Sequence, residues 1–358
     1  MSKFHELRVA SLEPETRDAV IVTFDVPEKD RDAFRFVQGQ HLTLRAELDG
    51  AEIRRSYSIC AAPDEGTLRV AIKRVEDGLF STWANRELQP GHLIECMEPS
   101  GHFNVPLEPE SRRHHVAFSV GSGITPVLSI IKATLKAEPY SSFTLFYGNR
   151  ASSSVLFKEE LENLKDRYLA RFNLVFILSR ELQDIELFNG RIDERKCGQL
   201  LKQWIDPSGI DVAYICGPQT MMEQVSRTLQ DHGVGRQRIK MELFASGLPV
   251  LPRKTPTVPV NGAGACKVTV VQDGRTRELF IPRNGGTILD SALEQGIELP
   301  YSCKGGVCST CRCKRTRGEV DINAAFALED YEIARGFILT CQSYPVTDEI
   351  TLDFDQET

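Results

Sequence analysis

Four cysteines near the end of the chain constrain its fold more than any other feature. Cys303, Cys308 and Cys311 follow a C-x4-C-x2-C pattern, and Cys341 stands farther along the chain. Thiolates at this spacing are the ligands of a [2Fe–2S] cluster, in which one tight loop supplies three ligands and a distant segment the fourth. The loop also contains the pair Gly305-Gly306, which lets the backbone fold closely around the sulfurs. The pattern therefore predicts that the last part of the chain folds around an iron–sulfur cluster.

A structural zinc site is the alternative for these thiols, because Cys308-x-x-Cys311 alone would fit one. The longer spacer before Cys308, the glycine pair and the distant fourth cysteine favour the cluster instead. Cys313 is left over and is expected to be a bystander. The chain has ten cysteines, and in a reducing cytoplasm we expect the scattered ones to be small buried residues rather than disulfide partners. The scattered set is Cys60, Cys96, Cys197, Cys216 and Cys266.

Length and composition limit the class of protein. The chain has 358 residues, of which 41% are hydrophobic and 26% are charged, as is typical of a globular protein with two or three domains. Its net charge of −7 argues against binding to nucleic acid, which requires a basic surface. The apolar runs are too short to span a membrane, and the first residues lack the apolar core of a signal peptide. We therefore expect a cytoplasmic protein that is not bound to a membrane.

The pattern of apolar residues changes along the chain and predicts three domains. Residues 1–110 contain short alternating segments separated by turn residues, which predicts a β-barrel. Residues 111–245 alternate strands with amphipathic helices, which predicts a doubly wound parallel α/β domain. Residues 246–264 are rich in proline and predict a linker. Residues 265–358 begin with two strands joined by a turn at Asp273–Gly274 and then reach the cysteine cluster.

The first domain contains a tetrapeptide whose chemistry suits a flavin. Arg55 can pair with a pyrophosphate, the ring of Tyr57 can pack against the isoalloxazine, and the hydroxyl of Ser58 can bond near the reactive edge of the ring. The tetrapeptide alone is a weak signal, because such a string is common on exposed strands.

A second feature of this domain lies about twenty residues farther along. Gly78 is followed by Ser81 and Thr82 at the start of an expected helix, where backbone N–H groups can bind phosphate. The alternative is a simple turn in which Ser81 or Thr82 caps that helix. The order and spacing of the two features favour a flavin site.

Two loops of the second domain predict a nucleotide site. Gly121 and Gly123 lie between a strand and a helix and allow close approach of a pyrophosphate, although the sequence departs from the G-x-G-x-x-G fingerprint. Thr125 can cap the helix, and the proline after it fits a first turn. Cys216 and Gly217 stand at the carboxyl end of another strand, where open α/β sheets bind ligands. A buried strand-end cysteine is the alternative for Cys216.

In this order, the motifs of residues 1–245 resemble the ferredoxin-NADP reductase superfamily, and residues 265–358 resemble a plant-type ferredoxin. The resemblance implies a flavin-binding β-barrel, an NAD(P)H-binding α/β domain and a β-grasp ferredoxin domain. It places Cys216 near the nicotinamide ring, and Glu242 and Phe244 near the flavin. It favours FAD, while FMN occurs in relatives with the same domain order.

The resemblance also bears on which dinucleotide is used. In NADP-specific relatives, a Ser-Arg pair like Ser179-Arg180 holds the ribose 2′-phosphate, and a guanidinium suits that group. The alternative is an exposed strand end. The Ser-Arg pair favours NADPH over NADH. The lysine or tyrosine partners expected downstream of it are not obvious, so NADH stays open.

These cofactors together predict an electron-transfer mechanism. A nicotinamide donates two electrons as a hydride and the cluster accepts one, and a flavin between them converts one process into the other. Several longer segments carry a further resemblance: FRFVQGQHLTLRAELDGAEIRRSYSIC, AIKRVEDGLFSTWANREL, FTLFYGNRASSSVLFKEEL, LPYSCKGGVCSTCRCK and FILTCQSYPVTDEITLDFD. With these segments, the chain over its full length resembles the family of reductase subunits that serve phenylacetyl-CoA oxygenases of phenylacetate degradation. The resemblance implies an NAD(P)H:acceptor oxidoreductase that delivers electrons to the subunits of a separate di-iron oxygenase.

Charge agrees with such a partner. Residues 265–358 contain 10 Lys and Arg against 15 Asp and Glu, a net charge of −5 that could steer docking to a basic surface. An acidic surface kept for solubility explains the charge equally well.

Two further hypotheses about the function of the chain remain open. One is a reductase for a different hydroxylase or a hybrid-cluster protein, and the other is a passive electron carrier or zinc-stabilised binding module without NAD(P)H activity.

Overall fold

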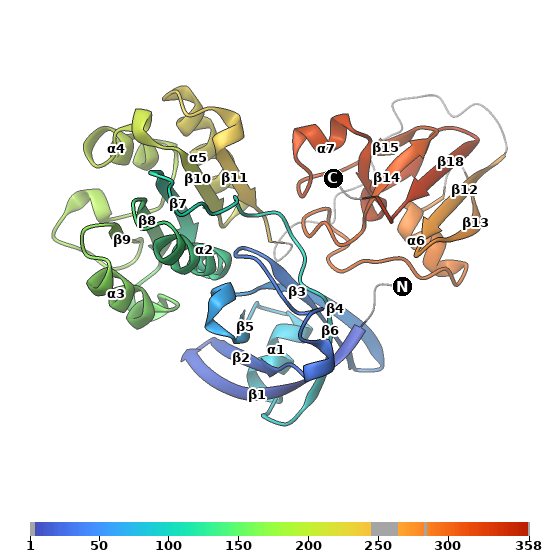
Figure 1. Ribbon diagram of the computed structural model, residues 1–358, viewed down its shortest axis with the longest axis horizontal. Helices are drawn as coiled ribbons and strands as arrows, with labels where there is room; N and C mark the ends of the chain where they lie inside the picture. Colours follow the sequence, from blue (N-terminus) through green and yellow to red (C-terminus); the bar gives the residue numbers. More distant parts are fainter. Residues whose placement is uncertain (1–3, 245–263, 283–284, 357–358) are drawn as a thin grey trace. The chain divides into compact units, whose positions relative to one another are not determined.

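The computed structural model describes residues 4–244, 264–282 and 285–356. The predicted linker 246–264 lies outside the described residues, apart from its last residue. The chain forms two compact units (Figure 1). One holds His5–Ile53 and Tyr57–Leu243, and the other holds the described part of Phe244–Thr358 with Phe4 and Arg54–Ser56.

The first domain is a six-stranded antiparallel β-barrel, as the sequence predicts. Its strands run in the order β4-β3-β6-β1-β2-β5, and a bridge between Ile59 and Val70 joins the two edges. Helix α1 (Leu79–Arg86) inserts Phe80 and Ala84 into the barrel core. The strands are β1 (Phe4–Thr16), β2 (Ala19–Asp25), β3 (His41–Leu48), β4 (Ala51–Ser58), β5 (Leu68–Lys73) and β6 (Leu93–Met97).

The second domain is a doubly wound α/β sheet, again as predicted. Its five strands are all parallel and run in the order β11-β10-β7-β8-β9. The chain leaves β7 toward β8 on one side and returns to β10 on the other, so the switch point lies between β7 and β10. The strands are β7 (His114–Val120), β8 (Ser142–Asn149), β9 (Phe172–Leu178), β10 (Val212–Cys216) and β11 (Ile239–Glu242).

Helices cover both faces of this sheet (Figure 1). Helices α4 and α5 share one apolar core with the strands, and α2 packs against β7, β8 and β10. Strands buried on both faces explain the continuous apolar runs in the sequence. The helices are α2 (Ile124–Ala137), α3 (Lys158–Arg167), α4 (Glu194–Gln203) and α5 (Gln219–Asp231).

The C-terminal domain has the β-grasp arrangement that the ferredoxin resemblance implies. Its main sheet runs in the order β13-β12-β18-β14-β16, with β12 antiparallel to β13 and parallel to β18. The turn predicted at Asp273–Gly274 is confirmed, since both residues have positive φ, 52° and 68°. The elements are β12 (Ala265–Gln272), β13 (Arg275–Pro282), α6 (Ile288–Glu294), β14 (Arg312–Arg317), β15 (Val320–Ile322), α7 (Asp330–Ala334), β16 (Phe337–Leu339), β17 (Ser343–Pro345) and β18 (Glu349–Asp353).

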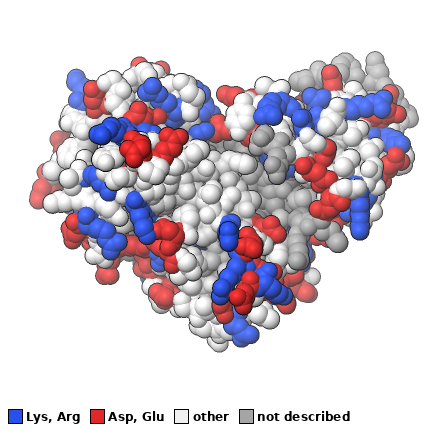
Figure 2. Space-filling view, viewed as in Figure 1, with Lys and Arg blue, Asp and Glu red and all other residues white. Residues whose placement is uncertain are grey.

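The surface agrees with the composition. On the face shown in Figure 2, charges of both signs are interspersed rather than gathered into one basic patch. None of the described helices is long and apolar enough to cross a membrane.

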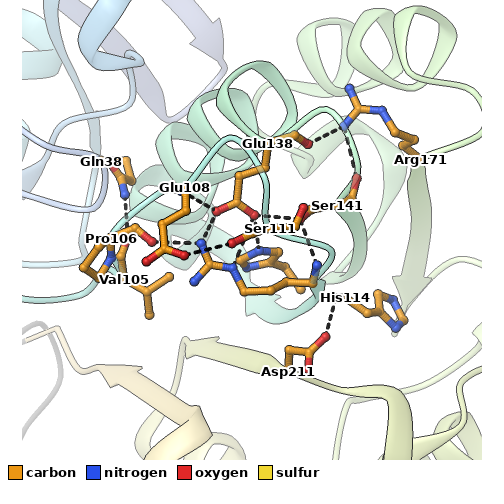
Figure 3. A network of polar contacts seen from close by, with 12 residues as sticks. Gln38, Val105, Pro106, Glu108, Ser111, His114, Glu138, Ser141, Arg171 and Asp211 are labelled. Carbon is orange, nitrogen blue, oxygen red and sulfur yellow. Dashed lines mark hydrogen bonds and ion pairs between the residues drawn. The ribbon is translucent and has the colours of Figure 1, made fainter.

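A buried carboxylate fixes the segment that joins the barrel to the sheet (Figure 3). Glu138, at the end of α2, is fully buried and accepts hydrogen bonds from Ser141 Oγ (2.7 Å), His115 Nε2 (3.1 Å) and the backbone N–H of Glu108 (3.1 Å). Arg113 completes the network with an ion pair to the same carboxylate. Burial by itself would raise the pKa of Glu138, but the hydrogen bonds from Arg113 and Ser141 outweigh burial and hold the pKa below its ordinary value.

We expect Glu138→Gln to lower the free energy of unfolding by about 2 kcal/mol at pH 7, because it removes the charge that Arg113 pairs with. A carboxyl with a lowered folded-state pKa stabilises the protein above its unfolded pKa, and this contribution is lost as the pH falls. The deficit should therefore shrink below about pH 4 in urea titrations. The matched control is Glu162→Gln, in an exposed pair with Lys158, for which we expect little change. If Glu138→Gln lowered the free energy of unfolding equally at pH 7 and below pH 4, this account of the Glu138 network would be contradicted.

Candidate cofactor sites

The four predicted cluster cysteines lie in one region of the C-terminal domain. Their thiols interact in two pairs, Cys303 with Cys308 and Cys311 with Cys341, and electrostatic interactions connect the pairs. A [2Fe–2S] cluster takes two thiolates on each of its two irons, so this pairing fits the cluster. Among the described residues, no group of three or more His, Cys, Asp or Glu side chains converges closely enough to hold one metal ion.

The backbone of the cysteine loop is arranged to donate hydrogen bonds to sulfur. Gly305 N–H lies 3.3 Å from Cys303 Sγ, and Cys303 N–H lies 3.5 Å from Cys308 Sγ. The hydrogen bond with Cys308, together with the backbone N–H groups of Val307, Gly305 and Cys308, lowers the pKa of Cys303 to about 6. Donors of this kind stabilise thiolate, which is the form that binds iron.

The same loop requires unusual backbone angles. Lys304 and Ser309 both have a φ of 52°, and Gly306 has a φ of 77°. A side chain on Gly306 would also lie 3.0 Å from the carbonyl oxygen of Ala324, so glycine is needed there for two reasons.

Cys313, in contrast, is buried in the core on β14 opposite Ile338. It forms part of the hydrophobic core, in keeping with its expected role as a bystander.

Glu242, which the resemblance placed near the flavin, has its carboxyl group between the barrel and the sheet. Ser58 Oγ, at the end of β4, donates to Glu242 Oε2 at 3.0 Å. Glu242 is the register partner of Cys216 on the neighbouring strand, so the three side chains meet at the carboxyl edge of the sheet. Burial raises the pKa of Glu242 to about 8, and the Ser58 hydrogen bond only partly offsets this. At neutral pH the carboxyl is therefore mostly protonated.

The barrel residues predicted to bind flavin lie on β4 and α1. Tyr57 is half-buried and packs against Phe80 with ring centroids 5.7 Å apart. Arg55 lies two positions earlier on the same strand and is exposed.

Gly78, not Ser81 or Thr82, is the N-cap of α1, so the simple capping alternative is wrong. The hydroxyl of Ser81 turns back to the carbonyl of Gly78 (3.1 Å) and accepts from the N–H of Val75 (3.1 Å), which organises the turn. No side chain caps α1, so its first N–H groups stay available to an anion.

The two nucleotide loops touch each other at the switch point of the sheet. A side chain on Gly123 would lie 2.2 Å from the carbonyl oxygen of Cys216, so only glycine fits there. Gly121 has a φ of 58°, and its carbonyl accepts from the hydroxyl of Tyr147 at 2.9 Å. Thr125 is not the helix cap that the sequence predicted. Helix α2 begins one residue earlier, so the threonine lies within its first turn and donates to the carbonyl of Ser122 at 3.0 Å.

Basic residues gather where β8 and β9 end. Ser179 follows β9 and donates to the carbonyl of Asn149 at 3.3 Å, and the N–H of Arg180 donates to the carbonyl of Arg150 at 2.8 Å. A parallel bridge between Leu178 and Asn189 brings the start of the Arg191 segment beside this edge.

Two of these basic residues were not predicted from the sequence. Arg150, Arg180 and Arg191 are all exposed, and within the described residues none of the three forms an ion pair with a carboxylate. Arg150 and Arg191 were missed because a lysine or tyrosine was expected after Ser179-Arg180. The strand register brings them to this edge from separate segments.

Three domain families match the chain in the order that the motifs predicted. Residues 6–105 match the oxidoreductase FAD-binding domain, residues 118–227 the oxidoreductase NAD-binding domain, and residues 270–346 the 2Fe-2S iron-sulfur cluster binding domain. The chain belongs to the family of NAD(P)H-dependent oxidoreductases that combine these three domains and serve as reductase components of oxygenases. FAD and a [2Fe–2S] cluster are its cofactors.

Individual relatives match over almost the whole chain. A subunit of the 1,2-phenylacetyl-CoA epoxidase of Escherichia coli (strain K12) is 45% identical over 99% of both chains. The ferredoxin reductase component of the 3-ketosteroid-9-alpha-monooxygenase of Rhodococcus rhodochrous is 33% identical over 97% of this chain and 96% of its own. Among solved structures, phthalate dioxygenase reductase has the same fold over 98% of both chains, with a TM-score of 0.58 and 23% identity.

The raised pKa of Glu242 predicts a pH-dependent change in stability. A carboxyl whose folded-state pKa lies above its unfolded value destabilises the fold as it ionises, so wild-type stability should decrease between about pH 5 and pH 8. Glu242→Gln removes this loss. We expect the Tm of the variant minus that of the wild type to be larger at pH 8.5 than at pH 5.5. For the control, Glu223→Gln at an exposed position of α5, the Tm of the variant minus that of the wild type should be the same at pH 5.5 and pH 8.5. If this Tm difference did not depend on pH for Glu242→Gln either, the prediction would be refuted.

Proposed function

We propose that this chain transfers electrons from NADPH through FAD and a [2Fe–2S] cluster to a separate di-iron oxygenase that acts on phenylacetyl-CoA. The observation that carries the proposal is the 45% identity, over 99% of both chains, to the 1,2-phenylacetyl-CoA epoxidase component from Escherichia coli. The full-length match at 33% to a 3-ketosteroid-9-alpha-monooxygenase reductase keeps a different hydroxylase as the second candidate. In either case we propose a cytoplasmic protein with domains at 1–110, 111–245 and 265–358 joined by a linker at 246–264.

On the barrel side, we propose that the flavin lies against Tyr57 with its reactive edge beside Ser58. FAD, when bound, accepts a hydride and releases electrons one at a time. Ser58 and the protonated Glu242 would keep a hydrogen-bond donor and an exchangeable proton at this edge. Cys216 is buried, and burial raises the pKa of its thiol well above the ordinary value, so it would pack as a neutral group against the nicotinamide. The proposed phosphate and flavin contacts are Arg55, Gly78, Ser81, Thr82 and Phe244.

On the nucleotide side, we propose that the glycine loops hold the pyrophosphate and that basic residues select NADPH. Gly121, Gly123, Thr125 and Gly217 would line the pyrophosphate path at the switch point. The 2′-phosphate would lie at the edge formed by Ser179, Arg180, Arg150 and Arg191. Exposed guanidinium groups that no described carboxylate neutralises are suited to an anion of this kind.

This arrangement predicts a coenzyme effect. Arg150→Gln and Arg191→Gln should each raise the KM for NADPH by about tenfold, because each removes one charge-assisted contact, and should leave the KM for NADH nearly unchanged. The measurement is steady-state reduction of an artificial acceptor with each coenzyme. Arg195→Gln on α4 is the matched control, since the Arg195 guanidinium is exposed and contacts Gln199. Equal changes in KM for both coenzymes would exclude a 2′-phosphate site at this edge.

The cluster would carry electrons out of the chain. Cys303, Cys308, Cys311 and Cys341 would hold it, and the backbone donors of the loop would stabilise its sulfur ligands. The net charge of −5 over residues 265–358 is suited to a basic docking surface on the acceptor.

The decisive experiment combines the loaded protein with NADPH, phenylacetyl-CoA and purified oxygenase subunits. We expect substrate turnover coupled to NADPH oxidation, and no turnover with the 3-ketosteroid system.

Cys308→Ser should abolish the cluster absorbance and the turnover while NADPH still reduces the flavin. Failure of a fully loaded preparation to support turnover would reject the proposed acceptor, and loss of flavin reduction in a folded Cys308→Ser protein would reject the modular route.

A further inference from the structure

Helix α2 connects the proposed nucleotide loop to the barrel (Figure 1). It begins directly after Gly121–Gly123, and its residues Ser129 and Lys132 lie on one face because they are three positions apart. That face meets barrel residues 60–65, which follow Ser58 on the chain. One helix therefore links the loop proposed to hold the pyrophosphate to the segment that follows the proposed flavin strand.

Lys132 is the centre of this contact. Its side chain is only 7% exposed, and its Nζ donates to the carbonyl of Cys60 at 3.4 Å and pairs with Glu65 Oε1 at 2.8 Å. It also pairs with Glu160 of α3, whose same oxygen accepts from Arg69 Nη2 of the barrel at 2.6 Å. Two cations and two carboxylates thus pair around a buried ammonium, while Glu65, Glu160 and Arg69 each keep part of their surface in solvent. A buried ammonium is tolerated only when it is paired in this way, which makes the geometry of the cluster specific.

Neighbouring contacts hold the same two elements. Ser129 Oγ donates to the carbonyl of Ala61 at 2.6 Å, and both groups are buried. The carboxylate of Glu15 in the barrel accepts from the backbone N–H of Phe157, which precedes α3 and has a φ of 57°. The barrel therefore fixes the flank of α2 and the first turn of α3 together.

We propose that Lys132 is a positioning residue for hydride transfer. By locking α2 to the barrel, it would set the separation between the nicotinamide and the flavin. In the step itself a hydrogen leaves the dihydronicotinamide with its electron pair and binds to the oxidised flavin, so the first is oxidised and the second is reduced. Lys132 exchanges no proton or electron. Its effect is geometric, and a displacement of about 1 Å can slow such a step by about a hundredfold. This inference rests on the proposed function.

The test uses holoprotein with Lys132→Met, which keeps an unbranched side chain one atom shorter and removes the charge. With NADPH in a stopped-flow instrument, we expect the limiting rate constant of flavin reduction to fall by about tenfold or more, because the hydride distance is no longer fixed. The NADPH concentration that gives half the limiting rate should change by less than about twofold, since no proposed coenzyme contact is lost. In the protein without NADPH, the backbone N–H groups of residues 60–65, apart from Pro63, should exchange hydrogen faster than in the wild type.

Two further variants separate positioning from simple loss of stability. Lys132→Met/Glu160→Gln restores the charge balance, so its Tm should return toward the wild-type value while flavin reduction stays slow. If Lys132→Met alone does not fold, the rate of flavin reduction is measured on this double variant instead. Lys136→Met, one turn farther along α2, removes a pair with Asp64 in which the lysine is 66% exposed, and should behave as wild type.

The outcomes distinguish this inference from the function on which it rests. Flavin reduction at the wild-type rate in the folded Lys132→Met protein or in the double variant would overturn the inference. Unchanged hydrogen exchange at residues 60–65 would also overturn it. A fully loaded wild-type protein that NADPH does not reduce would instead overturn the proposed function.

Discussion

The contact between the two nucleotide loops at the switch point is the constraint on which the rest of the site depends. A side chain on Gly123 would collide with the carbonyl of Cys216, so the loops after β7 and β10 can approach this closely only with glycine there. The parallel register of β10 and β11 places Glu242 beside Cys216, and Glu242 in turn meets Ser58 of the barrel. The glycine contact and the strand register together bring the loops after β7 and β10 and the polar groups of Glu242 and Ser58 to the same edge of the sheet.

Buried charge holds this arrangement in two places, and the two differ in kind. Around Glu138 a single carboxylate gathers several donors and fixes the connecting segment to the sheet. Around Lys132 two cations and two carboxylates join the barrel to α2 and α3. Hydrophobic burial sets no precise register between two surfaces, whereas the fully buried Glu138 and the 7% exposed Lys132 each need their partners at hydrogen-bond distance. A hydride transfer across the same boundary needs such a fixed geometry.

Much of the fold follows from local sequence patterns. The alternation of strands and helices predicted the doubly wound sheet, and the short apolar segments before it predicted the barrel, because each pattern reports which face of an element is buried. The turn at Asp273–Gly274 was predictable because few residue pairs accept positive φ twice in succession. The capping role of Thr125 was predicted wrongly, since α2 begins at Ile124, two residues before the start that a Thr125 cap implies. The roles of the individual flavin and nucleotide residues stay predictions.

By itself, the sequence determined the chemistry that the chain can carry: cysteine spacing for a cluster, glycine loops for phosphates and the order of three domains. These features are local, and their meaning depends on residues a few positions apart. Only the tertiary structure decided which distant side chains meet. The pairing of Ser58 with Glu242, the gathering of Arg150 with Arg180, and the burial of Lys132 between barrel and helix all depend on strand register and domain packing, which no local spacing encodes.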